Sequence, residues 1–145
     1  MTYDLRELAI KTSKKDRDLT PVTSLDDPFW AIWRNLRPLV QKALETADEY
    51  SIGDVLHFAY TGQWQVWHTD KSVAFTRIAS YPEHTTCVLV LAAGDLEDIA
   101  EYEPRICAWA KKQDCKYMEI FGRRGWQKAL DGYSEQYAVL RKGLS

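Results

Sequence analysis

The side chains best suited to metal binding or nucleophilic chemistry are Cys87, Cys107, Cys115, His57, His68 and His84. The cysteines are odd in number and show no CxxC spacing, which disfavours a disulfide framework and a structural zinc site. The histidines show neither HxH nor HExxH spacing, the patterns that bring two imidazoles to one metal ion. We therefore predict no metal site and three free thiols in a reducing compartment.

A small basic cluster surrounds a tryptophan in the last quarter of the chain. Arg123 and Arg124 precede Trp126, and Lys128 follows it. Guanidinium groups donate paired hydrogen bonds to phosphates and carboxylates, so such a cluster could bind an anion. A solvated face is the alternative interpretation. We keep Arg123, Arg124 and Trp126 as candidate interaction residues.

The chain is rich in aromatic residues, with six Trp and eight Tyr among 145 residues. Phe29, Trp30 and Trp33 place three large aromatic side chains within five positions. An aromatic stripe at helical spacing is typical of a core. Because Pro38 separates this segment from the rest of the helical pattern, the same residues are also candidates for docking to a protein partner. Both interpretations are open at this point.

Composition limits the class of protein. The length fits one domain with a sizeable core, and 46% apolar and 28% charged residues are ordinary for a globular protein. A net charge of −2 disfavours a nucleic-acid binder that works by neutralising phosphates. Residues 1–27 carry many charges and no apolar stretch typical of a secretion signal, and no apolar run is long enough to cross a bilayer. We expect an arm at 1–27 and a folded domain at 28–145, with no membrane or nucleic-acid partner.

Helical patterns dominate the first part of the domain. Asp27 and Pro28 form a helix start signal, and apolar residues recur at helical spacing as far as Ala47. Pro38 is expected to end one helix near residue 36 and to begin a second that runs to about residue 50. Ser51 with Asp54 predicts a capping box for a short helix, which ends near Gly62.

The period then changes to two. Segments 64–67, 73–80 and 85–92 predict three strands joined by short turns, and residues 88–91 are apolar on both faces, as in a central strand. A helical pattern over 96–113 follows, with its main helix expected to begin at Pro104. A strand at 116–121, a short helix at 124–130 and a last strand at 133–140 complete the domain. In that last strand Tyr133, Tyr137 and Val139 share one face.

This order of elements resembles the GNAT (Gcn5-related N-acetyltransferase) fold over residues 28–142. Residues 106–110 with 114–120 resemble the family's passage from its cofactor helix into the next strand. Gly125-Trp126 and residues 129–133 resemble its last helix and terminal Gly-aromatic step. The resemblance implies an α+β, GNAT-like fold. It has a mixed central sheet, two N-terminal helices, a β-meander and a βαβαβ C-terminal half.

The resemblance implies a pyrophosphate-binding turn after the central strand, of the form Arg/Gln-x-x-Gly-x-Gly/Ala. The matching place is 91–98, which has one glycine and neither Arg nor Gln; its positional cofactor residues are Ala93, Gly94 and Asp95. Asp95, Glu97 and Asp98 suit a helix N-terminus because they complement its dipole. They repel a diphosphate by on the order of 1 kcal/mol per close pair in water.

The resemblance also implies a tyrosine general acid in the last helix and a glutamate base on a central strand. Residues 126–131 contain no tyrosine, and Glu119 is the nearest candidate base, although a solvent-facing role is its alternative. Three other tyrosines could replace the acid only in a rearranged site: Tyr81, Tyr117 and Tyr137.

The sequence thus favours a GNAT-like non-catalytic binding or structural protein with a protein partner and no cofactor. Residues 119–126 are similar to small uncharacterised tailed-phage proteins, which indicates a phage-encoded, virion- or assembly-associated protein in the host cytoplasm. One alternative is an active acetyl-CoA-dependent N-acyltransferase with a non-standard pyrophosphate turn. Another is an inhibitor of a host protein.

Overall fold

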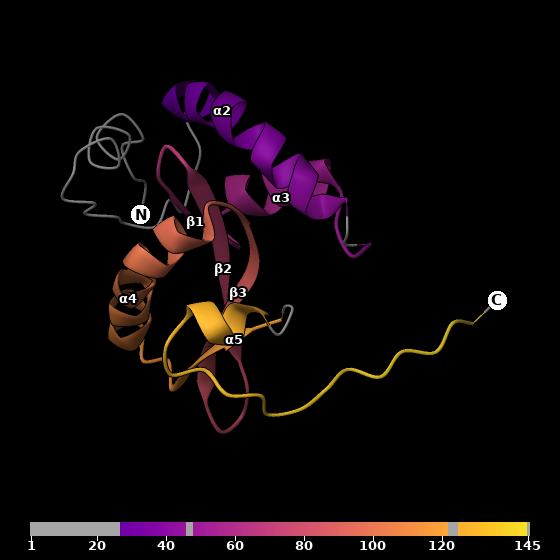
Figure 1. Ribbon diagram of the computed structural model, residues 1–145, viewed down its shortest axis with the longest axis vertical. Coiled ribbons are helices and arrows are strands. Elements are labelled where there is room, and N and C mark those ends of the chain that lie inside the picture. Colours follow the sequence, from indigo (N-terminus) through magenta and orange to yellow (C-terminus); the bar gives the residue numbers. More distant parts are fainter. Residues whose placement is uncertain (1–26, 46–47, 122–124, 145) are drawn as a thin grey trace.

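The computed structural model describes residues 27–45, 48–121 and 125–144 (Figure 1). Its helices are α2 (Asp27–Leu44), α3 (Ile52–Tyr60), α4 (Leu96–Lys112) and α5 (Gly125–Ala129), and its strands are β1 (Gln65–His68), β2 (Ser72–Ser80), β3 (Thr85–Gly94) and β4 (Tyr117–Ile120). Residues 1–26 of the expected arm lie outside the described residues. No helix within the described ranges is both long and apolar enough to cross a membrane.

The four strands form one mixed sheet in the order β1-β2-β3-β4. The first three are antiparallel neighbours, which confirms the predicted meander, and β4 pairs with β3 in parallel. The register between β2 and β3 shifts at Phe75/Thr76. β4 pairs with residues 86–89 of β3, so residues 90–94 have β2 on one edge and no described strand on the other.

Each face of the sheet carries its own core. On one face α2 and α3 pack over a cluster that includes Trp33, Val40 and Phe75. On the other face α4 packs over a cluster that includes Trp67, Leu89 and Ile106 (Figure 1). β3 contributes to both clusters, as its apolar run predicted. The predicted α+β layout, with a β-meander and helices on both faces of a mixed sheet, is confirmed at this level.

Capping chemistry explains where α3 begins. The Ser51 side chain accepts a hydrogen bond from the backbone N–H of Asp54 at 3.1 Å, and the Asp54 carboxylate accepts one from the backbone N–H of Ser51 at 2.9 Å. The predicted capping box is therefore confirmed. These hydrogen bonds lower the pKa of Asp54, with the backbone bond as the larger cause.

Two predicted helix breaks are wrong. Pro38 lies inside α2 and Pro104 lies inside α4, and both helices continue through them. A proline within a helix costs about 3 kcal/mol, because it lacks an N–H and crowds the preceding turn. Both prolines are exposed, so water can solvate the carbonyl groups that lose a partner. The apolar side chains of each helix that are buried around the proline, at about 1.5–3 kcal/mol each, outweigh that cost.

The predicted last strand is also wrong. Residues 133–140 are extended but join no β-ladder, and most of their side chains are exposed. Figure 1 shows this segment leaving the body of the domain beyond α5. The alternating pattern identifies a segment that is able to pair, but it does not show whether that segment forms backbone hydrogen bonds with a neighbouring strand.

Candidate functional site

The turn between β3 and α4 lies against the turn between β1 and β2. Gly94 has a φ of 102°, and a Cβ at this position would lie 2.2 Å from the Lys71 carbonyl oxygen. Directly after it, the backbone N–H of Asp95 donates to the same oxygen at 3.2 Å. Only a glycine can combine this backbone conformation with so close an approach. Gly94 is therefore explained by packing of backbone on backbone.

The amide groups that begin α4 already have an anionic partner within the chain. Asp95 is the N-cap, and its Oδ1 accepts hydrogen bonds from the backbone N–H groups of Glu97 at 2.9 Å and Asp98 at 3.3 Å. A helix N-terminus binds phosphate through these same donors and through its dipole. Here the Asp95 carboxylate takes that place, so a diphosphate would have to displace it.

Asp98 has a different role from its two acidic neighbours. Its carboxylate is 6% exposed and accepts hydrogen bonds from Ser72 Oγ at 2.6 Å and from the Thr69 hydroxyl. Ser72 Oγ also bonds the Tyr102 hydroxyl at 3.2 Å. This buried network joins α4 to the turn between β1 and β2. The expectation of three acidic groups facing a ligand is corrected, because only Asp95 and Glu97 are exposed.

We expect Asp98→Ala to lower the free energy of unfolding by about 2 kcal/mol, because it leaves buried hydroxyl groups without their acceptor. Urea unfolding followed by circular dichroism measures the change. The matched control is Glu97→Ala, which removes the same charge from the same helical turn at an exposed position. It should change stability by less than about 0.5 kcal/mol. Equal losses in the two variants would contradict the structural role of Asp98.

A hollow of about 570 Å³ lies at the C-terminal end of β3. Its walls come from α2, β3, the start of α4, and α5, and the residues that line it are Leu39, Lys42, Ala43, Ala92, Ala93, Gly94, Leu96, Ile99 and Trp126. The volume is in the range of small-molecule sites. Among the described lining residues Lys42 is the single titratable one, so this hollow offers apolar contact and one positive charge.

The candidate acid and base lie elsewhere on the sheet. Glu119 pairs with Val88, four residues before Ala92, which is roughly 13 Å along the strand. Its Oε2 accepts a hydrogen bond from the Tyr137 hydroxyl at 2.9 Å, and this contact is the main cause of a raised pKa of Tyr137. Neither residue lines the hollow. The Glu119 carboxylate is bonded to Tyr137 and lies roughly 13 Å from the end of β3. It therefore does not reach a substrate held at the end of β3.

Two of the three cysteines, Cys87 and Cys107, are poor nucleophiles in this fold. Burial raises the pKa of the Cys87 thiol to about 12. Burial, followed by a 2.8 Å hydrogen bond to Glu103, raises the pKa of Cys107 to about 12 as well. The thiolate is the reactive form, so both side chains are inert near neutral pH. No metal-binding group of three His, Cys, Asp or Glu occurs in the described part of the chain.

Among known proteins, the chain is similar to solved structures. No family model and no curated protein matches the chain. Wild-type TTHA1254 of Thermus thermophilus is 18% identical, with a TM-score of 0.53 over 77% of this chain and 91% of that chain. A GNAT family acetyltransferase of Staphylococcus aureus is 11% identical, with a TM-score of 0.55 over 83% of this chain and 95% of that chain. The fold is GNAT-like. At these identities the likeness extends to the fold alone.

The GNAT-like fold brings some of the predicted site residues together. Ala93, Gly94 and Trp126 line the same hollow, and Asp95 follows directly as the cap of α4. Trp33 is 6% exposed and belongs to the core on the α2 face, so its burial supports the core interpretation over docking. The side chains of Phe29 and Trp30, and the whole of Arg123 and Arg124, lie outside the described residues.

Sequence patterns missed one wall of the hollow and the anchors of the turn. Leu39, Lys42 and Ala43 of α2 face the end of β3, although about fifty residues of sequence separate them. Asp98 is anchored by Thr69, in the turn between β1 and β2, and by Ser72, the first residue of β2. The polar composition of residues 69–72 marked a turn, but only the GNAT-like packing shows what that turn contacts.

Proposed function

We propose that this chain is a non-catalytic binding domain on a GNAT-like fold, which does not take acetyl-CoA in the manner of an acyltransferase. The observation that carries the proposal is the N-terminus of α4. Asp95 Oδ1 accepts from two of its amide groups, and a third, the Asp95 N–H, donates to the Lys71 carbonyl. The site where a pyrophosphate would be held is occupied by the chain itself.

The position of the titratable groups supports the same proposal. Acyl transfer to an amine needs a base near the acceptor nitrogen and an acid near the leaving sulfur. Glu119 and Tyr137 bond each other beside β4, and the described lining of the hollow has no carboxylate and no tyrosine. A hollow of this composition is suited to apolar contact without proton transfer.

The proposal extends to a protein partner and no cofactor. The proposal also includes a phage-encoded protein that acts in the host cytoplasm, in the virion or during its assembly, and its ground is the resemblance of residues 119–126 noted in the sequence alone. Two exposed tyrosine side chains support the proposal of a protein partner, since tyrosines are enriched in interfaces. They are Tyr81, which follows β2, and Tyr117, the first residue of β4, and each is 49% exposed.

We expect acetyl-CoA to leave the thermal unfolding temperature unchanged. A ligand at one hundred times its dissociation constant adds about 2.7 kcal/mol to stability, so real binding at high ligand concentration is easily detected. The comparison variant is Asp95→Gly with Glu97→Gln. It frees the two amide groups and removes two negative charges, and glycine costs an N-cap only a few tenths of a kcal/mol.

Differential scanning fluorimetry and isothermal titration calorimetry give the readout. A shift in the double variant and none in the natural chain would locate the obstacle in the turn. A saturable shift in the natural chain would contradict the proposal directly.

One observation favours a second candidate, an N-acyltransferase with a non-standard pyrophosphate turn. The hollow lies where β3 extends beyond its pairing with β4, and its apolar walls suit a chain-like group. Incubation with acetyl-CoA and primary amines, followed by mass spectrometry of the products, tests this candidate. Acetylated amine in excess over a protein-free blank would establish it.

A further inference from the structure

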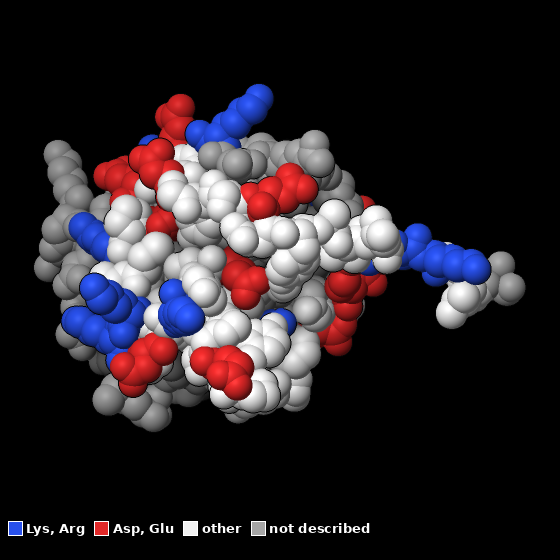
Figure 2. Space-filling view, turned by 90° about the horizontal axis from the view of Figure 1, so that it is seen from below, with Lys and Arg blue, Asp and Glu red and all other residues white. Residues whose placement is uncertain are grey.

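Four ring side chains gather at the end of the domain that carries the turn between β2 and β3, the end that faces the viewer in Figure 2. The centroid of the His84 ring lies 5.2 Å from that of Tyr81 and 5.1 Å from that of Tyr117. Glu119 raises the pKa of Tyr137 most, and Tyr81 raises it as well, so Tyr137 lies beside the same group. We call Tyr81, His84, Tyr117 and Tyr137 the aromatic patch.

Backbone hydrogen bonds fix three of these rings in place. The Tyr81 N–H donates to the His84 carbonyl at 2.8 Å, which closes the turn, and Pro82 restricts the backbone inside it. The Lys116 N–H donates to the Thr85 carbonyl at 2.7 Å, which joins the start of β4 to the same turn. A surface whose rings are already held in position loses little conformational freedom when a ligand binds. The patch is therefore preorganised.

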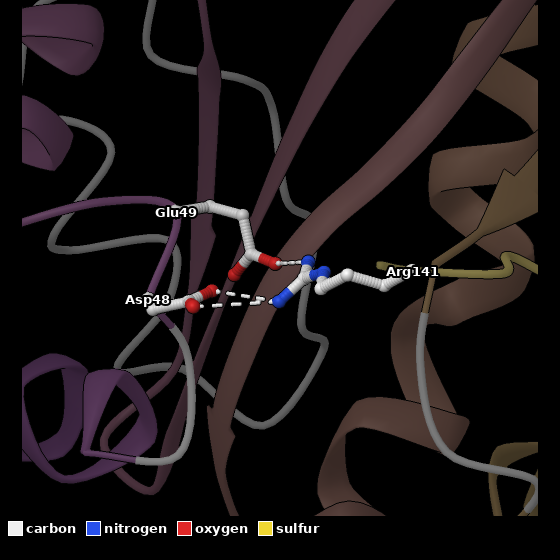
Figure 3. Close-up of polar contacts among 3 residues, drawn as sticks. All are labelled: Asp48, Glu49 and Arg141. Atoms are coloured by element: carbon white, nitrogen blue, oxygen red, sulfur yellow. Dashed lines mark hydrogen bonds and ion pairs between the residues drawn. The ribbon is translucent and has the colours of Figure 1, made fainter. Parts of the chain in front are cut away.

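The segment that carries Tyr137 is held on both sides of this residue. On one side the Tyr133 hydroxyl lies 3.5 Å from a carboxylate oxygen of Glu103 in α4. On the other side Arg141 bonds the two acidic residues at 48–49, at distances of 3.3 Å and 3.1 Å (Figure 3). Between these contacts the Tyr137 hydroxyl donates to a β4 carboxylate at 2.9 Å. Tyr137 is thus kept against the sheet although it is 61% exposed.

The charges around the patch favour a positive group on the ligand. Glu119 uses Oε2 for its bond to Tyr137, and its Oε1 has no hydrogen-bond partner among the described residues. The Lys116 ammonium lies 5.4 Å from the centroid of the Tyr117 ring, so this ring already attracts a cation of its own chain. Figure 2 shows mainly uncharged surface at this end, with isolated acidic groups in it.

The chemistry of exposed tyrosines matches an extended, proline-rich peptide. A polyproline II helix makes no internal hydrogen bonds, so its carbonyl groups are free acceptors beside apolar rings. A tyrosine offers an apolar ring face and a hydroxyl donor together, and the hydroxyls of Tyr81 and Tyr117 bond no other described side chain. Nucleic-acid bases also stack on aromatic rings, but their phosphates would meet Glu83, Glu119 and a net charge of −2.

We propose that the aromatic patch binds a proline-rich segment of a protein partner in the polyproline II conformation, with a basic residue beside Glu119. The inference rests on the proposed function, because it names the chemistry of the protein partner. Proline rings pack on Tyr81 and Tyr117, whose hydroxyls donate to the peptide carbonyls. The patch lies at the start of β3 and the hollow at its end, roughly 25 Å apart along the strand, so the two sites are separate.

The first test measures binding of short peptides by fluorescence anisotropy. Two fluorescein-labelled peptides of six prolines, with one arginine at either end, are titrated with the full chain. We expect saturable binding of at least one of them, with a Kd below about 1 mM. Replacing its prolines by alanine, or its arginine by glutamate, should weaken binding by about tenfold. The absence of saturable binding for both peptides would overturn the proposal.

The second test locates the site with variants of exposed residues. Tyr81→Ala and Tyr117→Ala should each weaken peptide binding by about tenfold, and Glu119→Gln should reduce the preference for arginine over glutamate in the peptide. The matched control is Tyr60→Ala on α3, which removes a tyrosine that is 56% exposed outside the patch and should leave binding unchanged. Circular dichroism checks that each variant folds. Equal binding by Tyr117→Ala and the natural chain would contradict the assignment of the patch.

Two further ligands separate this inference from the alternatives. A single-stranded oligothymidine that binds the natural chain but not Tyr117→Ala would assign the patch to nucleic acid, and the proline-rich partner would be rejected. Acetyl-CoA tests the proposed function on its own, because its site would be at the other end of β3. Failure of both peptides without an acetyl-CoA shift rejects only this partner, whereas a saturable acetyl-CoA shift beside normal peptide binding rejects only the proposed mode of the hollow.

Discussion

Replacing Gly94 by alanine is expected to lower the free energy of unfolding by about 3 kcal/mol or more. The added Cβ would lie 2.2 Å from the Lys71 carbonyl oxygen and 2.8 Å from the Ser72 Cα. Both atoms belong to backbone, so no side-chain rotation relieves the collision. The two turns must separate, which breaks the hydrogen bond from the Asp95 N–H to Lys71 and strains the network around Asp98.

Gly132→Ala is the matched control for this prediction. Gly132 also has a positive φ, but a Cβ there meets nothing within 4 Å. Its replacement by alanine should lower the free energy of unfolding by only about 1 kcal/mol, the cost of holding a residue other than glycine at a positive φ. Urea unfolding of the two variants beside the natural chain gives both numbers. If the losses were equal, the close approach of the two turns would have no energetic weight, and the packing role of Gly94 would be wrong.

Local signals in the sequence predicted the elements that depend on neighbouring residues. Ser51 and Asp54 fix the start of α3 through bonds that span three positions, so a short window contains the whole cause. The apolar run in β3 likewise predicts a strand covered on both faces. The turn after β3 was located because a glycine and an acidic helix start follow that run directly.

Features that depend on distant contacts were not predicted. Pro38 and Pro104 are penalised by any local rule, and only the burial of the helices around them shows that packing outweighs the penalty. Residues 133–140 are the opposite case, since they satisfy the pattern of a strand but join no ladder in their own chain. In both cases the structure depends on contacts with residues far away in the sequence, and the spacing of residues within the segment does not predict those contacts.

The three acidic residues after Gly94 have different roles that the sequence alone does not distinguish. They look equivalent along the chain, and the helix dipole explains all of them equally well. The fold gives each a separate role: Asp95 caps the helix, Glu97 is exposed, and Asp98 anchors α4 to the opposite turn. Under the proposed function, the obstacle to a diphosphate is therefore one carboxylate bonded to two amide groups, together with one exposed charge.

His68 is the buried group most sensitive to acid. It is 5% exposed at the end of β1, and its Nε2 has no hydrogen-bond partner among the described residues. Burial lowers its pKa from the ordinary 6.5 to about 4, and this exceeds the opposing effects of the Thr69 backbone and the Asp70 charge. The folded chain therefore holds His68 neutral in a pH range where the unfolded chain protonates it.

We expect this difference to remove about 3 to 4 kcal/mol of stability as the pH falls from 6.5 to 4, because the two pKa values differ by 6.5 − 4 = 2.5 and each pH step of one between them costs about 1.4 kcal/mol. The contribution is present above pH 6.5, where both states are neutral, and is lost as the unfolded state gains a proton that the folded state refuses. His68→Phe keeps an aromatic ring in the site and removes the titration. Urea unfolding across this pH range should show a smaller acid loss in His68→Phe than in the natural chain.

His57→Gln supplies the control, since His57 is exposed on α3 and its replacement should leave the acid loss as it is in the natural chain. Carboxylates elsewhere titrate in all three proteins, so the quantity to compare is the difference between each variant and the natural chain at each pH. A difference for His68→Phe that stays constant from pH 6.5 to 4 would contradict the prediction. It would mean that the imidazole gains its proton without unfolding, either because water reaches Nε2 or because the end of β1 opens locally.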